Sequence, residues 1–355
     1  MTRSGQPVRV LIVDDSALIR KLLDMLLSSD PAIEVVGTAA DPFEARERIK
    51  ALDPDVVTLD IEMPRMDGLS FLQKIMTLRP MPVVMISTLT QANADVTIRA
   101  LEIGAVDFVA KPTANVAAAM EVLAAELQTK VKAAARARVR RRTLSAAAAP
   151  ARAPAAPAFR HAGKVAFIGA STGGVEALRL VLSSFPADCP PTLITQHMPE
   201  RFTASFANRL NQLCAMTVVE ARHEQPVETG HVYIAPGAHH LEIMRSNGRL
   251  LCQLHDEAPA SGHRPSVDVL FRSAARVVGR HAVGAILTGM GKDGAEGMLE
   301  MRSAGGATLG QDEHSSLIYG MPQVAFERGA VMRQYALDKI AGAILAACGA
   351  EAVVA

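Results

Sequence analysis

The sequence contains few cysteines, almost no net charge and no long apolar run. Its four cysteines, Cys189, Cys214, Cys252 and Cys348, are widely separated, so we expect reduced thiols rather than a metal site or a disulfide framework. The formal net charge of +1 gives no whole-chain indication of nucleic-acid or anionic-membrane binding. No apolar stretch is long enough to span a bilayer, and the opening MTRSGQPVRV lacks a signal segment. We therefore expect a soluble, cytoplasmic protein without direct membrane insertion.

The sequence does contain enough apolar material for two cores. It has 355 residues, of which 49% are hydrophobic, and this length favours two domains over one. The segment 129–163 consists largely of Ala, Pro and Arg, and it cannot bury enough surface to offset its ordering entropy. We predict a first domain at 1–128, a flexible linker at 129–163 and a second domain at 164–348. The basic side chains in and near the linker, interpreted as a solvated tether rather than a nucleic-acid contact, are Arg136, Arg138, Arg140, Arg141 and Arg142.

Apolar runs alternate with helical patterns throughout the first domain. The predicted strands are VRVLIV at 8–13, IEVVGTA at 33–39, VVTLDI at 56–61, PVVMIST at 82–88 and VDFVA at 106–110. Each is followed by apolar residues at helical spacing, so the pattern predicts a parallel sheet wrapped by helices on both faces. Ligands bind such sheets at the carboxyl ends of the strands.

Polar side chains follow these strands at that edge. Asp14 and Asp15 follow the first strand, and Asp60 ends the third. Three converging carboxylates require a cation, and Mg²⁺ fits because it prefers carboxylate and phosphoryl oxygens. Ser87 ends the fourth strand and Lys111 follows the fifth, where they would hold the oxygens of a phosphoryl group on Asp60. Taken singly, the aspartate pair is also typical of a helix N-cap, and the lysine of a surface charge.

The motifs VDDS, LDIEMPRMDG, VMIST and VDFVAKP resemble the receiver domain of response regulators over the whole first domain. The resemblance implies that Asp60 is phosphorylated by a chemotaxis histidine kinase. It also implies that Asp14, Asp15 and Asp60 bind Mg²⁺. The switch residues implied by the resemblance are the Ser87 hydroxyl, the aromatic Phe108 and the phosphate-sensing Lys111.

The second half again alternates strand and helix, with a polar group closing each of three strands. Ser171 follows KVAFIGA in a G-x-S-x-G turn that is typical of a nucleophile elbow. His197 follows PPTLITQ, and Asp293 follows VGAILTGMGK. In a doubly wound sheet they would lie along one edge as the nucleophile, base and orienting carboxylate of acyl transfer.

Other interpretations of these residues are open on the sequence alone. The glycine-rich segment is also typical of an ordinary turn, as is the pair Asp293–Gly294. His197 also fits a structural loop histidine. In the chain order of an α/β-hydrolase, His314 would be the base with Asp293 as its partner.

A metal site and a thiol nucleophile are two further alternatives. His239–His240 together with His255–Asp256 suggest metal ligands, but no H-E-x-x-H spacing supports them. Cys252 lies near His255 in the sequence, although a buried structural thiol is the favoured interpretation. The segment GASTGG lacks the spacing of dinucleotide-binding and P-loop motifs.

A second set of motifs resembles the catalytic domain of the chemotaxis protein-glutamate methylesterases. These motifs are IGASTGG, TQHMP, VYIAPG, RPSVDVLF, LTGMGKDGAEG and YGMP, and they span nearly all of 164–348. The resemblance implies a triad of Ser171, His197 and Asp293, and it makes His314 a weaker candidate. It implies hydrolysis of glutamyl methyl esters on methyl-accepting chemoreceptors, and some family members also deamidate glutamines there. No cofactor is implied for the hydrolase site.

We therefore expect an α/β protein with two doubly wound parallel-sheet domains, a flavodoxin-like receiver and a Rossmann-like catalytic domain, joined by a flexible linker. Backbone N–H groups of Thr172 and Met290 are expected to hold the oxyanion. In the family the unphosphorylated receiver covers the active-site entrance, and phosphorylation, with an inward turn of Phe108, is expected to open it. The alternative is a response regulator whose second domain only binds, for example to DNA. No helix-turn-helix signature supports it, so we expect no nucleic-acid partner.

Overall fold

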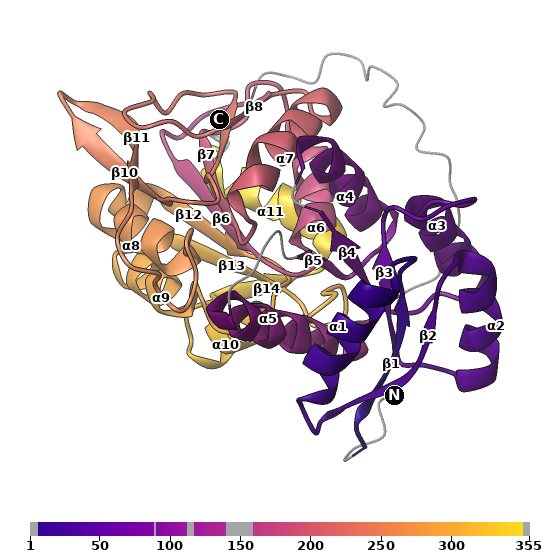
Figure 1. Ribbon diagram of the computed structural model, residues 1–355. Helices are drawn as coiled ribbons and strands as arrows, with labels where there is room; N and C mark the ends of the chain where they lie inside the picture. Colours follow the sequence, from indigo (N-terminus) through magenta and orange to yellow (C-terminus); the bar gives the residue numbers. More distant parts are fainter. Residues whose placement is uncertain (1–5, 89, 112–116, 140–158, 351–355) are drawn as a thin grey trace. The chain divides into compact units, whose positions relative to one another are not determined.

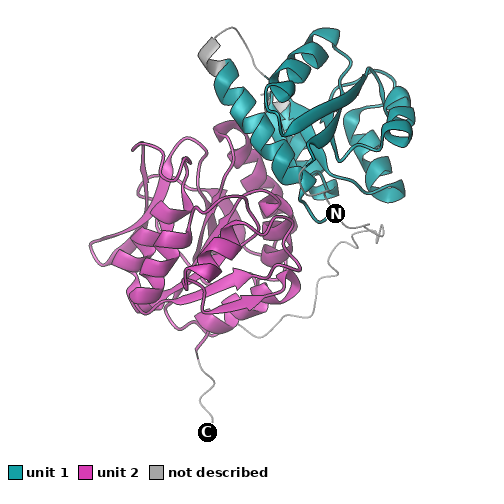
Figure 2. Ribbon diagram, turned by 90° about the horizontal axis from the view of Figure 1, so that it is seen from below, with its two compact units in different colours: residues 1–151 teal, residues 152–355 magenta. Residues whose placement is uncertain are grey.

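The computed structural model describes residues 6–88, 90–111, 117–139 and 159–350. The chain divides into two compact units, Met1–Ala151 and Arg152–Ala355 (Figure 2). Within the described ranges, no helix combines the length and the apolar character needed to cross a bilayer.

The first unit is built on a five-stranded parallel sheet in the order β2-β1-β3-β4-β5 (Figure 1). Its strands are β1 (Val8–Val13), β2 (Ile33–Ala39), β3 (Val56–Asp60), β4 (Val83–Ser87) and β5 (Asp107–Ala110). Its helices are α1 (Ala17–Ser28), α2 (Pro42–Leu52), α3 (Gly68–Leu78), α4 (Gln91–Ile103) and α5 (Ala117–Ala135). The order 2-1-3-4-5 is that of flavodoxin-like sheets, whose ligands bind where the direction of winding reverses, between β1 and β3.

Local sequence fixes where the helices of this unit begin. Ser16 and Asp41 cap α1 and α2 by accepting hydrogen bonds from backbone N–H groups of the first turn. Asp67 caps α3 in the same way. The next residue, Gly68, must lack a side chain because a Cβ atom there would lie 1.9 Å from the Asp60 carbonyl oxygen. The glycine thus lets the α3 turn lie directly against the end of β3.

The last helix of the unit runs past residue 128, where we predicted the domain to end. Lys130 lies on this part of α5, and its ammonium group is 3.3 Å from the Asp107 carboxylate and 2.6 Å from the Phe108 carbonyl oxygen. Because these contacts attach α5 to β5, the helix belongs to the first unit through Ala135. Most of the predicted linker, at 140–158, lies outside the described residues.

The second unit contains a seven-stranded parallel sheet in the order β14-β13-β12-β6-β7-β9-β8. Its strands are β6 (Val165–Ala170), β7 (Thr192–Gln196), β8 (Thr217–Glu220), β9 (His231–Ile234), β12 (Ala282–Ile286), β13 (Ala307–Gln311) and β14 (Arg333–Tyr335). An antiparallel ribbon of β10 (His240–Ser246) and β11 (Arg249–His255) stands apart from this sheet (Figure 1). The winding direction reverses between β6 and β12, so this is where a ligand is expected.

Helices cover the second sheet. They are α6 (Gly174–Leu182), α7 (Glu200–Leu213), α8 (Val267–Val277), α9 (Ala295–Ser303), α10 (Met321–Glu327) and α11 (Leu337–Cys348), with a short 3₁₀ helix at Gly279–His281. Helix α8 packs on α9, and α9 on α10, whereas α6 packs on α7 and α11. The strands β6, β7 and β12 are buried along their whole length, as expected for parallel strands covered on both faces.

One glycine brings a helix end close to the catalytic edge of the sheet. A Cβ atom at Gly169 on β6 would lie 2.2 Å from the Val267 side chain at the start of α8. The close approach sets the amino terminus of α8 beside the end of β6. Both units are thus parallel α/β structures, and the predicted fold class is confirmed.

Candidate active site and candidate metal centre

Three side chains predicted for acyl transfer meet at the carboxyl ends of β6, β7 and β12. Ser171 follows β6, His197 follows β7, and Asp293 lies in the loop after β12. The Nδ1 atom of His197 is 3.1 Å from Ser171 Oγ. Its Nε2 atom is 2.8 Å from Asp293 Oδ2. The side chains thus form one continuous chain from hydroxyl to imidazole to carboxylate, in the order that the sequence predicts.

The Asp293 carboxylate is buried, and both of its oxygens accept hydrogen bonds. Its Oδ1 accepts hydrogen bonds from Ser266 Oγ at 2.8 Å and the Asp268 N–H at 3.0 Å, and its Oδ2 accepts one from the Val267 N–H at 2.7 Å. Burial alone raises the pKa of Asp293, but the hydrogen bond and charge of His197 and the Val267 and Ser266 donors lower it to about 2. The positive end of α8 acts in the same direction. Asp293 is therefore a permanent anion.

This anion determines which nitrogen of His197 is able to act as a base. A carboxylate only accepts hydrogen bonds, so the Nε2 atom facing Asp293 carries the proton. The Nδ1 atom facing Ser171 is then free to accept the hydroxyl proton. The ring of His263 stacks on His197 with centroids 3.7 Å apart and planes 12° from parallel, which restricts the tilt of the base.

Two backbone segments surround the nucleophile where the oxyanion donors are predicted. The N–H of Ser171 donates to the Thr288 carbonyl oxygen at 3.1 Å, and the next amide along the chain is that of Thr172. A Cβ atom at Gly289 would lie 2.8 Å from Ser171 Cβ. Glycine at this position therefore lets the turn that carries Met290 approach the serine. The oxyanion roles of Thr172 and Met290 stay predictions.

His239, His240 and Asp256 of the suggested metal site have other partners, whereas both ring nitrogens of His255 are buried without a hydrogen-bond partner among the described residues. The Nδ1 atom of His239 contacts the Asp256 carboxylate. The neighbouring His240 is buried, and its Nδ1 accepts a hydrogen bond from the Ser266 N–H at 3.2 Å while its Nε2 lies 3.2 Å from the Ala258 carbonyl oxygen. Because both ring nitrogens are used by backbone groups, His240 supports the loop before α8 rather than a metal ion.

The thiol and the alternative base are not found in the triad. Cys252 is buried on β11, and burial raises the pKa of its thiol to about 12, so it is no nucleophile at neutral pH. His314 lies in the loop after β13, and the imidazole that reaches Asp293 is that of His197. The serine–histidine–aspartate chain order is thus the one that the geometry favours.

Three neighbours of this site carry structural roles that the sequence analysis did not assign. They are Gln196, His263 and Ser266. His263 directly precedes the RPSVDVLF motif, and Ser266 lies in it. Gln196 directly precedes His197 in the TQHMP motif. Nothing in the spacing of these motifs indicates which of their side chains face the triad.

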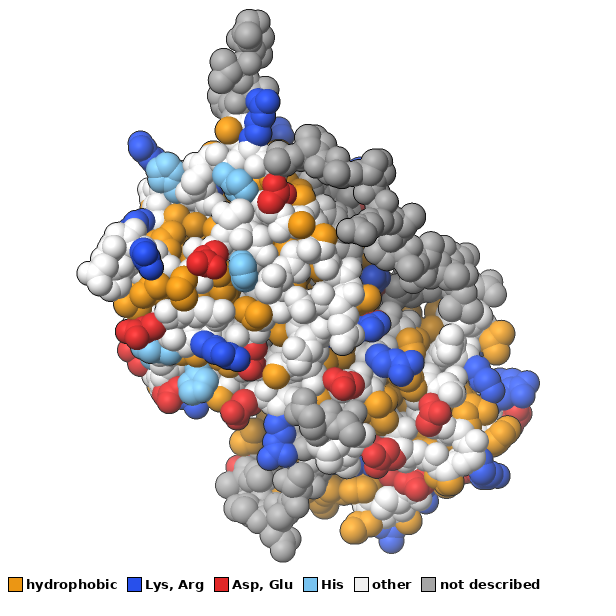
Figure 3. Space-filling view, turned by 90° about the horizontal axis from the view of Figure 1, so that it is seen from above, with side chains coloured by type: hydrophobic (Ala, Val, Ile, Leu, Met, Phe, Trp, Pro, Cys, Tyr) orange, Lys and Arg blue, Asp and Glu red, His pale blue; other side chains and the backbone are white. Residues whose placement is uncertain are grey.

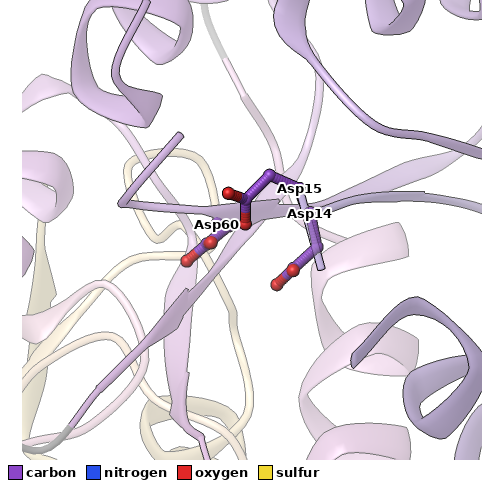
Figure 4. A group of neighbouring side chains, drawn as sticks. All are labelled: Asp14, Asp15 and Asp60. Atoms are coloured by element: carbon purple, nitrogen blue, oxygen red, sulfur yellow. The ribbon is translucent and has the colours of Figure 1, made fainter. Parts of the chain in front are cut away.

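In the first unit the acidic cluster forms as predicted. The carboxylates of Asp14, Asp15 and Asp60 have oxygens within 4.8 Å of one another at the ends of β1 and β3 (Figure 4). Asp14 and Asp60 are buried, whereas Asp15 is exposed. The Lys111 ammonium lies 2.9 Å from Asp14 and 2.8 Å from Asp60.

Burial makes this cluster electrostatically costly. It raises the pKa of Asp60 to about 6, although the hydrogen bond and charge of Lys111 oppose the shift. Burial lowers the pKa of Lys111, but its ion pairs with Asp60 and Asp14 outweigh this, and the net shift is upward. One ammonium faces three carboxylates, so the pocket has excess negative charge and all-oxygen ligands. These properties fit Mg²⁺.

Two of the three predicted switch residues, Ser87 and Phe108, are buried. The Ser87 hydroxyl is 2.9 Å from that of Thr97 on α4, and Thr97 in turn donates to the Asn93 carbonyl oxygen at 2.7 Å. Phe108 is only 4% exposed, with the Lys130 ammonium 5.1 Å from its ring centroid. An inward turn would start from an exposed ring. In this conformation the Phe108 ring, which β5 carries, is already buried.

Figure 3 shows the distribution of charged side chains on one face of the structure. On the face shown in Figure 3, the Lys and Arg side chains of the described residues are interspersed with Asp and Glu. A nucleic-acid-binding face usually gathers basic side chains into a patch or stripe. This face has no such patch among its described residues.

Comparison with known proteins identifies relatives of both units. Residues 166–344 match the CheB methylesterase family, and residues 10–122 match the response regulator receiver domain. A protein-glutamate methylesterase/protein-glutamine glutaminase of Caulobacter vibrioides is 59% identical over 347 residues, covering 95% of this chain and 97% of the relative. One of Dechloromonas aromatica is 54% identical, covering 96% and 99%.

A solved structure resembles the second unit. The crystal structure of the Thermotoga maritima CheB methylesterase catalytic domain has 34% sequence identity and a TM-score of 0.51, and it covers 52% of this chain and 98% of that domain. The alternative of a second domain that only binds, including one that binds DNA, finds no support in these matches.

Proposed function

The chain belongs to the CheB methylesterase family and carries a response regulator receiver domain, and from this we propose that it removes methyl groups from chemoreceptor glutamates under the control of receiver phosphorylation. The relatives named above are also protein-glutamine glutaminases, so deamidation of receptor glutamines is part of the proposal. The observation that carries it is the hydrogen-bonded chain from Ser171 through His197 to Asp293.

In the first half of the proposed reaction, His197 Nδ1 takes the Ser171 proton as the serine oxygen attacks the ester carbonyl carbon. Asp293 keeps the other ring proton on Nε2 and stabilises the imidazolium that forms. The negative charge on the carbonyl oxygen is held by the Thr172 and Met290 N–H groups. When the tetrahedral intermediate collapses, the imidazolium returns its proton to the leaving oxygen, and methanol departs.

In the second half, water hydrolyses the acyl-enzyme. His197 takes a proton from the water, the hydroxide oxygen attacks the acyl carbon, and the Ser171 oxygen leaves with the proton from the imidazolium. The products are a glutamate carboxylate and the original hydroxyl. With a glutamine substrate the same steps release ammonia instead of methanol.

In the receiver, we propose that Asp60 accepts the phosphoryl group and that Asp14, Asp15 and Asp60 hold Mg²⁺. The ion supplies charge neutralisation for the phosphoryl oxygens. Lys111 binds one of these oxygens as a cation, and the Ser87 hydroxyl donates to another after leaving Thr97. A chemotaxis histidine kinase is the proposed phosphodonor, and methyl-accepting chemoreceptors are the proposed substrates, which places the enzyme in the cytoplasm.

Methanol release from methylated receptors tests the assignment of the triad. Ser171→Ala and His197→Ala should each lower the rate by several orders of magnitude, with unchanged circular dichroism. His314→Ala is the matched control and should retain activity. An inactive His314→Ala beside an active His197→Ala would make the assignment of the base wrong.

A further inference from the structure

We infer that Gln196 is a positioning residue that holds the peptide between Ser171 and Thr172 in the orientation needed for oxyanion stabilisation. This inference rests on the proposed function. Gln196 is the last residue of β7 and is 3% exposed, so its side chain lies in the protein interior.

The Gln196 amide joins the two loops that carry the nucleophile and the base. Its Nε2 donates to the Ser171 carbonyl oxygen at 3.0 Å and to the His197 carbonyl oxygen at 3.1 Å. The Ser171 carbonyl oxygen also accepts a hydrogen bond from the Gly174 N–H at 2.7 Å. Two donors therefore hold this carbonyl on the inner side of the elbow.

Holding this carbonyl also fixes the direction of the neighbouring N–H. The Ser171 carbonyl and the Thr172 N–H belong to one planar trans peptide, so they point in opposite directions. While the carbonyl faces Gln196, the Thr172 N–H faces away from it. If this peptide rotated, its N–H would turn away from the oxyanion, and its carbonyl oxygen would face the oxyanion instead.

The other end of the amide indicates why glutamine is present. Its Oε1 is buried and has no hydrogen-bond partner among the described residues, which costs free energy. A Cβ atom at Gly174 would lie 2.0 Å from this oxygen, so the start of α6 leaves space for it. Exchanging the two ends of the amide would set an oxygen against two carbonyl oxygens. The donor end is thus the part that the site uses.

The test compares full-length Gln196→Met with wild type, using kcat and KM for methanol release from methylated receptor. Methionine has a similar shape and lacks both the donor and the unpartnered oxygen. We expect kcat to fall about 100-fold, as for the loss of one oxyanion donor, with KM changed less than threefold and no loss of thermal stability. A packing role predicts full activity, so a kcat above one third of wild type overturns the inference.

Gln196→Glu is the second variant, which keeps the inference testable if the methionine variant does not fold. A buried glutamate has a raised pKa, and only its protonated form can donate to a carbonyl. The ratio of variant to wild-type kcat should therefore rise as the pH falls, and a ratio that is independent of pH would contradict the inference.

A neighbouring threonine provides the matched control. Thr195 is fully buried on β7, and its hydroxyl has no hydrogen-bond partner among the described residues. Thr195→Val should leave kcat within threefold of wild type, and an equal loss in this variant would overturn the specific role of Gln196. Wild-type protein that releases no methanol would instead refute the proposed function, which separates the two failures.

Discussion

Replacing Asp60 by asparagine should stabilise the first unit against unfolding. Burial raises the pKa of this carboxyl from 3.8 to about 6. The folded state therefore binds the proton more tightly than the unfolded state, and stability falls as the pH rises between these two values. The free-energy cost of burying the charged carboxylate is absent below the lower pKa and complete above the higher one. A difference of about 2 pKa units corresponds to about 3 kcal/mol.

This figure is the upper limit of the gain expected at pH 7.5 without divalent cations. Asparagine keeps the shape of the side chain and removes its charge, while Lys111 retains its ion pair with Asp14 at 2.9 Å. Mg²⁺ should stabilise the wild type by binding the folded state and so reduce the difference between the two proteins.

The assay must report on the first unit alone. The chain has no tryptophan and three tyrosines. The tyrosines, Tyr233, Tyr319 and Tyr335, all lie in the second unit, so intrinsic fluorescence does not follow the receiver. Amide hydrogen exchange with peptide-level mass spectrometry does. The most protected amides of β3 and β4 should exchange up to about 100-fold more slowly in Asp60→Asn, since each tenfold change corresponds to about 1.4 kcal/mol.

Asp15→Asn is the matched control because Asp15 belongs to the same cluster but is exposed. Its effect on the same amides should stay below threefold. If Asp60→Asn exchanges at the wild-type rate or faster, the buried charge is not the cost that its raised pKa indicates, and the reasoning is refuted.

Two further predictions concern the receiver. A small-molecule phosphodonor with Mg²⁺ should label the protein on Asp60, and mass spectrometry can locate the label. The Asp60→Asn substitution or chelation of Mg²⁺ should prevent this labelling. Labelling that persists in Asp60→Asn would identify another acceptor. A fragment that begins at Lys164 should release methanol faster than the unphosphorylated full-length protein, because the linker makes any inhibitory docking intramolecular. If the fragment releases methanol at the same rate as the unphosphorylated full-length protein or more slowly, the receiver does not inhibit by covering the active-site entrance.

The parts of both sites that follow strands could be predicted from the sequence. Parallel strands end at one edge of their sheet, so Ser171 after β6 and His197 after β7 had to lie near each other once the strands were recognised. The remaining parts depend on how loops fold back. His263 stacks on His197 only because the loop before α8 returns to the β7 end, and no local pattern encodes that return.

Composition also gave a misleading signal at the end of the first domain. The Ala- and Lys-rich segment after residue 128 has few large apolar residues, which is typical of a linker. In the structure it continues α5, because Lys130 pairs with Asp107 and lies over Phe108. A charged side chain provides this attachment, and hydrophobic patterning cannot detect it. The burial of Phe108 likewise depends on the strand that carries it, whereas the expected inward turn rests on the resemblance and stays a prediction.

The two units bury a functional carboxylate to the same extent and give it opposite properties. Asp60 and Asp293 are each 2% exposed, yet the pKa of the first is about 6 and that of the second about 2. Asp293 accepts four hydrogen bonds, from His197, Ser266 and two N–H groups of the α8 turn. Asp60 shares one ammonium with Asp14 and accepts a backbone hydrogen bond from Glu62.

The number of donors therefore decides what each carboxylate can do. Asp293 is stabilised as an anion near neutral pH, so in the proposed reaction it orients His197 and stabilises the imidazolium without exchanging a proton. Asp60 is a poorly stabilised anion beside two other carboxylates, and a cation or a covalent bond at its oxygen relieves that cost. Under the proposed function, the same edge of the fold thus supports a fixed electrostatic partner in one unit and a phosphoryl acceptor in the other.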